Sequence, residues 1–105
     1  MDMSVIRKLC GEGSLRWTNH IMTRIFQRGI SIEDVESSLQ SGEIIEEYPA
    51  DYPYPSCLVL GFTQNSIPLH VVCGVTENEL WMITAYHPRM EEWEEGCRNR
   101  RRDIQ

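Results

Sequence analysis

Apolar residues follow a helical period in two neighbouring stretches near the start of the chain. Residues 18–28 gather apolar side chains on one half of a helix, with Thr18 as a candidate N-cap and Gly29 as the residue that ends it. The second stretch begins at Ser31, which opens a variant capping box, and it ends at Gly42. The pattern therefore predicts two amphipathic helices separated by a tight connection.

Further along the chain, the period changes from helical to extended. Residues 43–48 can form a first strand, and three runs rich in Val, Ile, Leu and aromatic residues predict strands at 56–63, 67–75 and 80–87. Three Tyr-Pro steps within residues 48–55 predict an extended loop, because each proline disfavours helical geometry in the residue before it. The later joints are short enough for hairpins, so consecutive strands should pair antiparallel.

Two helices followed by an antiparallel meander are typical of an α+β fold. We expect residues 1–105 to form one domain, in which the two N-terminal helices pack on one face of a three- to four-stranded antiparallel sheet. A short C-terminal helix is predicted at 90–97, anchored by Trp93. Residues 1–13 fit a short helix or a loose lead-in, and residues 98–105 a frayed tail. The second sheet face should be partly exposed or covered by a partner.

Composition narrows the class of protein. The chain has 41% hydrophobic and 25% charged residues, which is ordinary for a soluble globular protein. No apolar run approaches the ~18 residues of a membrane span, and the N-terminus lacks the apolar stretch of a secretory signal, so we expect a cytoplasmic location. The four cysteines form no Cys-x-x-Cys pair and should be free thiols. Neither a metal nor a cofactor is expected.

The charged residues are distributed unevenly. The net charge is −6, which argues against a general nucleic-acid binder. Residues 1–28 hold five basic and two acidic residues, residues 29–88 hold nine acidic residues and no Lys or Arg, and residues 89–105 hold five of each. Every basic residue therefore lies near one end of the sequence. Either folding brings the two ends into one basic patch, or they are two unrelated solvated stretches.

Several polar residues could carry chemistry. His20, Arg24 and Arg28 lie at i, i+4 and i+8, so they form one ridge that could hold a phosphate or could simply be a solvated helix face. His70 sits in an apolar strand, where it is either a structural residue or a general acid–base group. A three-residue hairpin loop would place it opposite Tyr86, whereas a two-residue loop would make the two diagonal neighbours, and the sequence leaves both registers open.

These residues belong to a longer pattern that resembles a known family. The pattern comprises segments 19–35, 42–48, 53–61, 68–72 and 83–93. In this order, and over residues 17–102, it resembles the small bacterial domain-of-unknown-function family four-two-five-eight. That family is similar to the RelE/ParE and BrnT-like toxins, so the resemblance implies a RelE-like fold with helices packed on an antiparallel sheet.

The resemblance also implies a function. RelE-like toxins cleave RNA without a metal, by driving a ribose 2′-hydroxyl onto the adjacent phosphate, and they pair with an antitoxin protein. The hypothesis is therefore a metal-independent endoribonuclease toxin of a toxin–antitoxin pair, with RNA as substrate. Its residues are grouped by role: proton transfer by His20, His70 and Tyr86; phosphate binding by Arg24, Arg28 and Arg89; support by Thr84.

Two other functions compete with this hypothesis. One is a non-catalytic protein-binding module of the same fold that docks a partner on its exposed sheet face. The other is an enzyme that acts on a small-molecule phosphate. RelE-type ribonucleases are usually strongly basic and this chain is not. Either the basic ends form a focused patch, or the catalytic function is absent.

Overall fold

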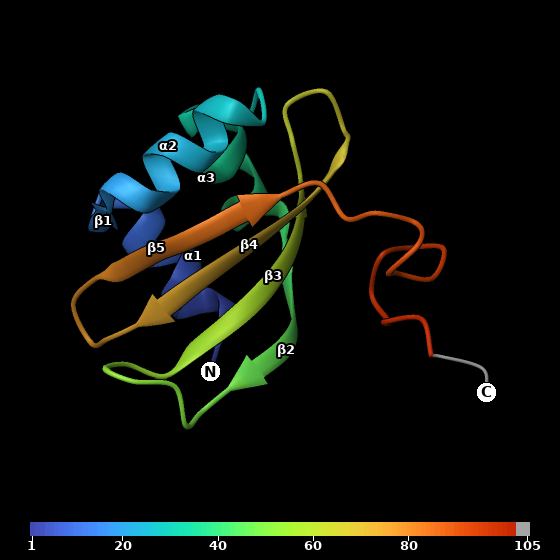
Figure 1. The fold of residues 1–105 in the computed structure, drawn as a ribbon. Coiled ribbons are helices and arrows are strands. Elements are labelled where there is room, and N and C mark those ends of the chain that lie inside the picture. Colours follow the sequence, from blue (N-terminus) through green and yellow to red (C-terminus); the bar gives the residue numbers. More distant parts are fainter. Residues whose placement is uncertain (103–105) are drawn as a thin grey trace.

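The computed structural model describes residues 1–102 as three helices and a five-stranded sheet. In the sheet the strand order is β1-β5-β4-β3-β2, with β1 parallel to β5 and every other pair antiparallel. Figure 1 shows the helices on one side of the sheet and the C-terminal segment on the other. In chain order the elements are α1 (Met3–Gly11), β1 (Leu15–Trp17), α2 (Asn19–Gln27), α3 (Ile32–Ser41), β2 (Glu43–Tyr48), β3 (Ser56–Phe62), β4 (Pro68–Val75) and β5 (Leu80–Tyr86).

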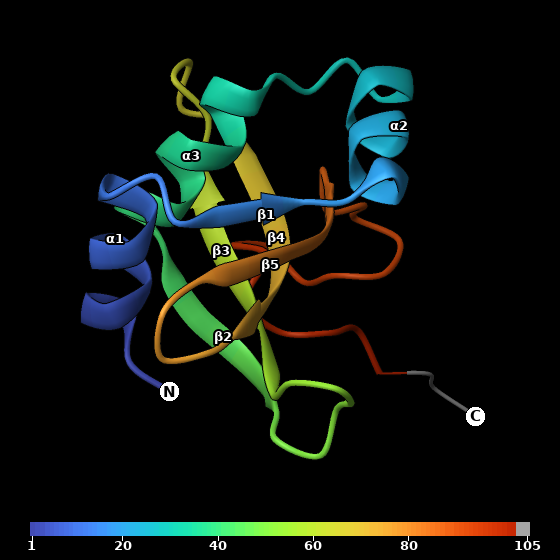
Figure 2. The same ribbon diagram turned by 90° about the vertical axis from the view of Figure 1, so that its left-hand side faces the viewer.

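The α+β class is confirmed, but the predicted architecture of two helices on an antiparallel sheet of three or four strands is wrong. A third helix, α1, begins after Asp2, whose side chain accepts a hydrogen bond from the backbone N–H of Ser4. The strand β1 pairs in parallel with β5 and makes the sheet mixed. Figure 2 looks onto the helices and shows β1 joining α1 to α2 along the sheet. Three residues are too few to reveal a strand by alternation, because a period of two needs a longer run.

The predicted C-terminal helix at 90–97 is also wrong. Residues 89–101 form turns, and an isolated antiparallel bridge joins Trp93 to Arg100. The backbone at Gly96 and Cys97 has φ of +90° and +63°, in the left-handed region that a right-handed helix does not use. Trp93 does act as an anchor, since only 2% of its surface is exposed. Residues 103–105 of the predicted frayed tail lie outside the described residues.

The elements that the sequence pattern predicted in the middle of the chain lie where expected. Thr18 and Ser31 cap α2 and α3 by accepting hydrogen bonds from backbone N–H groups three residues on. Gly29 lies in the connection after α2, and its φ of +68° is a left-handed conformation that favours glycine. No helix among residues 1–102 combines the length and the apolar character that crossing a membrane requires.

The hairpin between β4 and β5 changes register along its length. Next to the turn, Val75 pairs with Leu80, whereas at the far end His70 pairs with Tyr86. A β-bulge that leaves Ile83 without a partner lies between the two registers. The bulge therefore places His70 directly opposite Tyr86, although the register at the turn would not.

The sheet buries side chains on both of its faces. On the helix side, strand residues such as Val71 and Met82 pack with the helices in one core. On the opposite side, Leu58, Leu60 and His70 are also buried. A segment formed by residues 87–102, which we call the C-terminal segment, lies on this side of the sheet and contacts His70 through Cys97 and Trp93. Trp93 and Cys97 are its buried side chains. The second face is thus covered by the chain itself over part of its area.

The helix α3 approaches β3 with no space for side chains between the backbones. A Cβ placed on Gly61 would lie 2.0 Å from the carbonyl oxygen of Ser38, and one placed on Gly42, at the end of α3, would lie 2.8 Å from the carbonyl oxygen of Leu60 in β3. Both distances are far shorter than van der Waals contact. The two glycines therefore set the distance at which α3 packs on the sheet.

We expect Gly61→Ala to lower the free energy of unfolding by about 1–3 kcal/mol or more, because the added methyl group forces α3 away from β3. Gly11→Ala is the matched control. A Cβ there meets only Gln40 Nε2 at 3.6 Å, and alanine favours the helical conformation. Urea unfolding followed by circular dichroism measures both variants. Equal stability of the two variants would contradict this account of helix packing.

Candidate functional site

A pocket of about 550 Å³ lies where β5 ends. Its lining comes from the end of α2, the end of β5 and the C-terminal segment, and comprises Arg28, Tyr86, His87, Arg89, Glu92, Trp93 and Arg100. We call it the arginine pocket. Arg28 belongs to the basic residues near the start of the sequence, and Arg89 and Arg100 to those near its end. Folding therefore brings part of the two basic ends together.

Arg28 is fixed in the pocket by the edge of β5. Its Nη1 donates to the carbonyl oxygen of Ala85 at 2.8 Å and to Oγ1 of Thr84 at 3.3 Å. Within residues 1–102, its Nε and Nη2 have no hydrogen-bond partner, and no carboxylate pairs with it. The guanidinium group is thus held in place and keeps donors for an anion.

The guanidinium group of Arg100, unlike that of Arg28, is paired with a carboxylate. Its Nε and Nη2 donate to the two carboxylate oxygens of Glu46 at 2.9 and 3.1 Å, and its guanidinium lies over the ring of Trp93 at 4.6 Å. The Arg100 hydrogen bonds hold the pKa of Glu46 below its usual range. Burial, together with a hydrogen bond to Glu46, raises the pKa of Tyr48 to about 12. Arg100 therefore contributes more to the wall of the pocket than to its net charge.

Arg89 stands at the rim of the pocket. Its Nε lies 3.5 Å from Oε2 of Glu91, and both side chains are largely exposed. An exposed pair of this kind is weak, so the guanidinium can exchange Glu91 for another anion at little cost. Glu92 adds a second carboxylate to the lining.

His70 lies beneath the pocket and not in its lining. The side chain is fully buried, and its Nε2 donates to the carbonyl oxygen of Cys97 at 2.8 Å. In the neutral ring Nδ1 is then the acceptor, and the hydroxyl of Tyr86 lies 3.4 Å from it. Burial lowers the pKa of His70, which favours this neutral form. The imidazole thus supports Tyr86 and the C-terminal segment.

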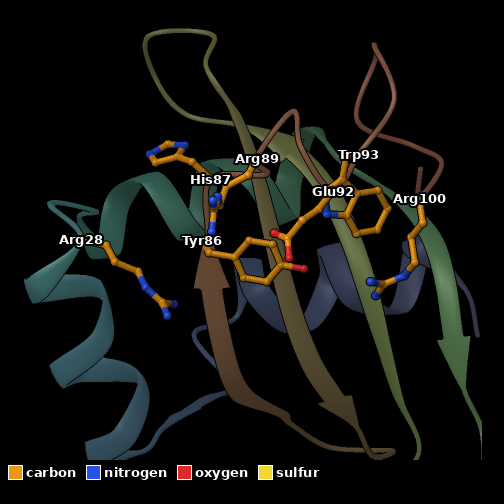
Figure 3. Close-up of a pocket in the computed structure, with 7 residues that line it drawn as sticks. All are labelled: Arg28, Tyr86, His87, Arg89, Glu92, Trp93 and Arg100. Atoms are coloured by element: carbon orange, nitrogen blue, oxygen red, sulfur yellow. The ribbon is translucent and has the colours of Figure 1, made fainter. Parts of the chain in front are cut away.

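Tyr86 presents its hydroxyl between the two sides of the pocket. Figure 3 shows it pointing toward Glu92, Trp93 and Arg100, with Arg28 on the other side of the ring. Burial raises the pKa of Tyr86, so the phenol keeps its proton at neutral pH and can act as a donor.

His87 is the exposed imidazole of the pocket. Its Nδ1 lies 2.9 Å from the carbonyl oxygen of Pro68, and a carbonyl can only accept, so Nδ1 carries the proton. Nε2 of the neutral ring is therefore free to take up a proton. The tautomer fixed by Pro68 leaves Nε2 as the accepting nitrogen of His87.

The structure brings together some of the residues in the sequence hypothesis and separates others. Arg28, Tyr86 and Arg89 line the arginine pocket, and Thr84 holds Arg28. By contrast, His20 and Arg24 line a different, shallow hollow on the exposed face of α2.

Sequence reasoning assigned no site role to two other lining residues, Glu92 and Trp93. They lie in a segment without periodicity, and the bridge between Trp93 and Arg100 gives no sequence signal. The position of His87 at the end of a strand, next to Tyr86, was a signal that could have found it. Within the described residues, no three His, Cys, Asp or Glu side chains are grouped so as to hold a metal ion.

We expect the chain to lose stability as the pH falls from about 7.5 to 5.5, because the unfolded chain binds a proton on His70 below about pH 6.5 that the folded chain resists. The stabilisation that comes from a lowered histidine pKa is complete at pH values above the histidine pKa of the unfolded chain. It declines as the pH falls below that pKa. Replacing the imidazole in His70→Gln should remove this part of the pH dependence. Urea midpoints at a series of pH values measure it.

The matched control is His20→Gln, on an exposed helix face, which should keep the wild-type dependence on pH. Carboxyl groups such as Glu46, whose pKa is lowered, contribute at lower pH and do not interfere. The same slope in His70→Gln and in the wild type would contradict the burial of a neutral imidazole.

Comparison with known proteins identifies one family. The family described as "Domain of unknown function (DUF4258)" matches residues 17–87, from β1 to the end of β5. The match includes Arg28, Tyr86 and His87, and it ends at the first residue of the C-terminal segment, whose later residues complete the pocket. No curated protein and no solved structure matches the chain. Because the family match covers more than half of its residues, this chain belongs to the DUF4258 family.

Proposed function

We propose that this protein is a metal-independent endoribonuclease that binds a substrate phosphate in the arginine pocket. The observation that carries the proposal is the meeting of Arg28 with Arg89 and Arg100, which are distant in sequence, beside the hydroxyl of Tyr86. Guanidinium groups match phosphate oxygens in both charge and geometry. The free donors of Arg28 are well suited to a phosphodiester.

The proposed reaction is an intramolecular transesterification. The ribose 2′-oxygen attacks the adjacent phosphorus and gives its proton to a base, while the bond from phosphorus to the 5′-oxygen breaks and that oxygen takes up a proton. The products are a 2′,3′-cyclic phosphate and a 5′-hydroxyl. Positioning and charge stabilisation of the phosphorane supply the catalysis, so the reaction requires no metal.

The lining residues divide these tasks. His87 takes the proton through Nε2, and Arg28 and Arg89 hold the phosphorane oxygens. Tyr86 turns its one hydroxyl proton from His70 Nδ1 to the leaving oxygen and donates it there. His70 is a positioning residue for Tyr86. The proposal keeps the reaction and the phosphate-binding roles of Arg28 and Arg89 from the sequence hypothesis. It transfers proton uptake to His87, because His20 lies in a separate hollow.

A protein partner is part of the proposal. Phe26 is 87% exposed on α2 and Met22 lies one turn before it, partly exposed. Such a pair of apolar side chains fits contact with a cognate antitoxin, as in a toxin–antitoxin pair. The same two residues favour the second candidate function, a non-catalytic protein-binding module. The two functions differ in whether the purified chain cleaves RNA.

We expect Arg28→Ala to reduce the rate of RNA cleavage about 100-fold, because the phosphorane loses a preorganised donor. Arg24→Ala, one turn earlier on the same helix and outside the pocket, should cleave at the wild-type rate. The assay uses a single-stranded RNA at low salt with a chelator present, followed by analysis of the product ends.

Intact RNA after incubation with the wild-type protein would reject the ribonuclease and leave the binding module. Cleavage lost equally in Arg24→Ala and Arg28→Ala would reject the assignment to this pocket. Since Arg28 also holds Ala85, urea unfolding of Arg28→Ala must show a folded protein, and Arg28→Lys provides a variant that keeps the charge.

A further inference from the structure

A second hollow, of about 340 Å³, lies nearer the start of β5 than the arginine pocket, and its lining is mainly apolar. It is lined by the loop of residues 49–55 and by β5, and its main side chains are Asp51, Tyr52, Pro53, Tyr54, Trp81 and Ile83. Trp81 alternates along β5 with Leu80 and Met82, which pack in the helix-side core. The hollow is therefore on the same sheet face as Tyr86.

The hollow contains aromatic side chains that are only partly covered by the rest of the fold. The rings of Tyr54 and Trp81 stack with centroids 5.6 Å apart. Tyr52 is 95% exposed, so its ring packs on almost nothing. An exposed tyrosine beside a stacked aromatic pair offers a planar ligand a face on which to stack.

The hollow also contains a hydrogen-bond donor without an acceptor. Trp81 Nε1 is buried and has no partner, and among residues 1–102 it is the one buried side-chain nitrogen or oxygen in that state. A buried donor without a partner costs free energy that a ligand acceptor would recover. Because this nitrogen is buried, an acceptor reaches it only when the side chains that cover it move aside.

The charges of the hollow favour a neutral ligand. Its lining contains no lysine or arginine and one carboxylate, that of Asp51. A phosphate would be repelled there, whereas an uncharged ring with an acceptor atom would not. Outside this lining, the guanidinium of Arg16 lies over the ring of Trp81, 5.7 Å from its centroid, but its charge is paired with Glu79, whose Oε2 lies 2.7 Å from Arg16 Nε.

We propose that this hollow binds a nucleobase of single-stranded RNA whose phosphate occupies the arginine pocket; the inference rests on the proposed function. The base stacks on Tyr52 and accepts a hydrogen bond from Trp81 Nε1. From Ile83 to Tyr86 is three residues along β5, or about 10 Å, so a strand of a few nucleotides spans both sites. An unpaired base presents both its ring face and its acceptors, which a duplex does not.

The test follows the indole N–H signal of Trp81 by NMR, assigned with Trp81→Phe, during titration with a short single-stranded oligoadenylate. We expect this signal to shift, and a duplex of the same length to leave it unchanged. Tyr52→Ala should weaken binding about tenfold. Phe62→Ala, which removes a partly exposed aromatic ring at the end of β3 and outside the hollow, should bind as the wild type does.

A second titration, with adenosine, separates this inference from the proposed function. Adenosine carries no phosphate and should shift the Trp81 signal in Arg28→Ala as it does in the wild type, whether or not the chain cleaves RNA. If RNA binds without shifting the Trp81 signal, and Tyr52→Ala does not weaken that binding, the base-binding inference is overturned while the proposed function stands. A shift caused by a proline-rich peptide, and by neither oligoadenylate nor adenosine, would overturn it in favour of a peptide groove.

Discussion

Burial of the His70 imidazole is the constraint on which the second sheet face depends. A polar ring without exposed surface needs a partner for each nitrogen, and here the partners are the carbonyl of Cys97 and the hydroxyl of Tyr86. Trp93 packs edge-on against the same ring, at 4.4 Å between centroids. One side chain in β4 thereby fixes the path of the C-terminal segment and the orientation of Tyr86, which form two walls of the arginine pocket.

Ion pairs with the edge strand β2 complete this arrangement and determine which charges remain for a ligand. Arg98 pairs with Glu43, and Arg100 pairs with Glu46. The acidic middle of the chain thus neutralises much of its basic end, which explains how a chain of net charge −6 can still hold a cationic site. The charge available in the pocket is concentrated on Arg28, whose contacts are all neutral.

The sequence was sufficient to predict the elements whose signals are local. Caps at Thr18 and Ser31 and the alternation of apolar residues placed two helices and four strands. β1 was missed because its pairing partner, β5, is more than 60 residues away in the chain. The residues of the pocket were harder still. The i, i+4 spacing placed Arg24 and Arg28 together, but α2 ends at Gln27, and Arg28 turns toward β5.

Because of the C-terminal segment, the folded domain extends beyond the region that matches the family. The match to the family ends at residue 87, whereas Trp93 and Cys97, beyond it, pack on and bind the buried His70. A polypeptide shortened to the matched region would leave His70 without these contacts and Glu43 and Glu46 without their cations. The packed structure is therefore longer than the matched region, and its contacts extend to Arg100.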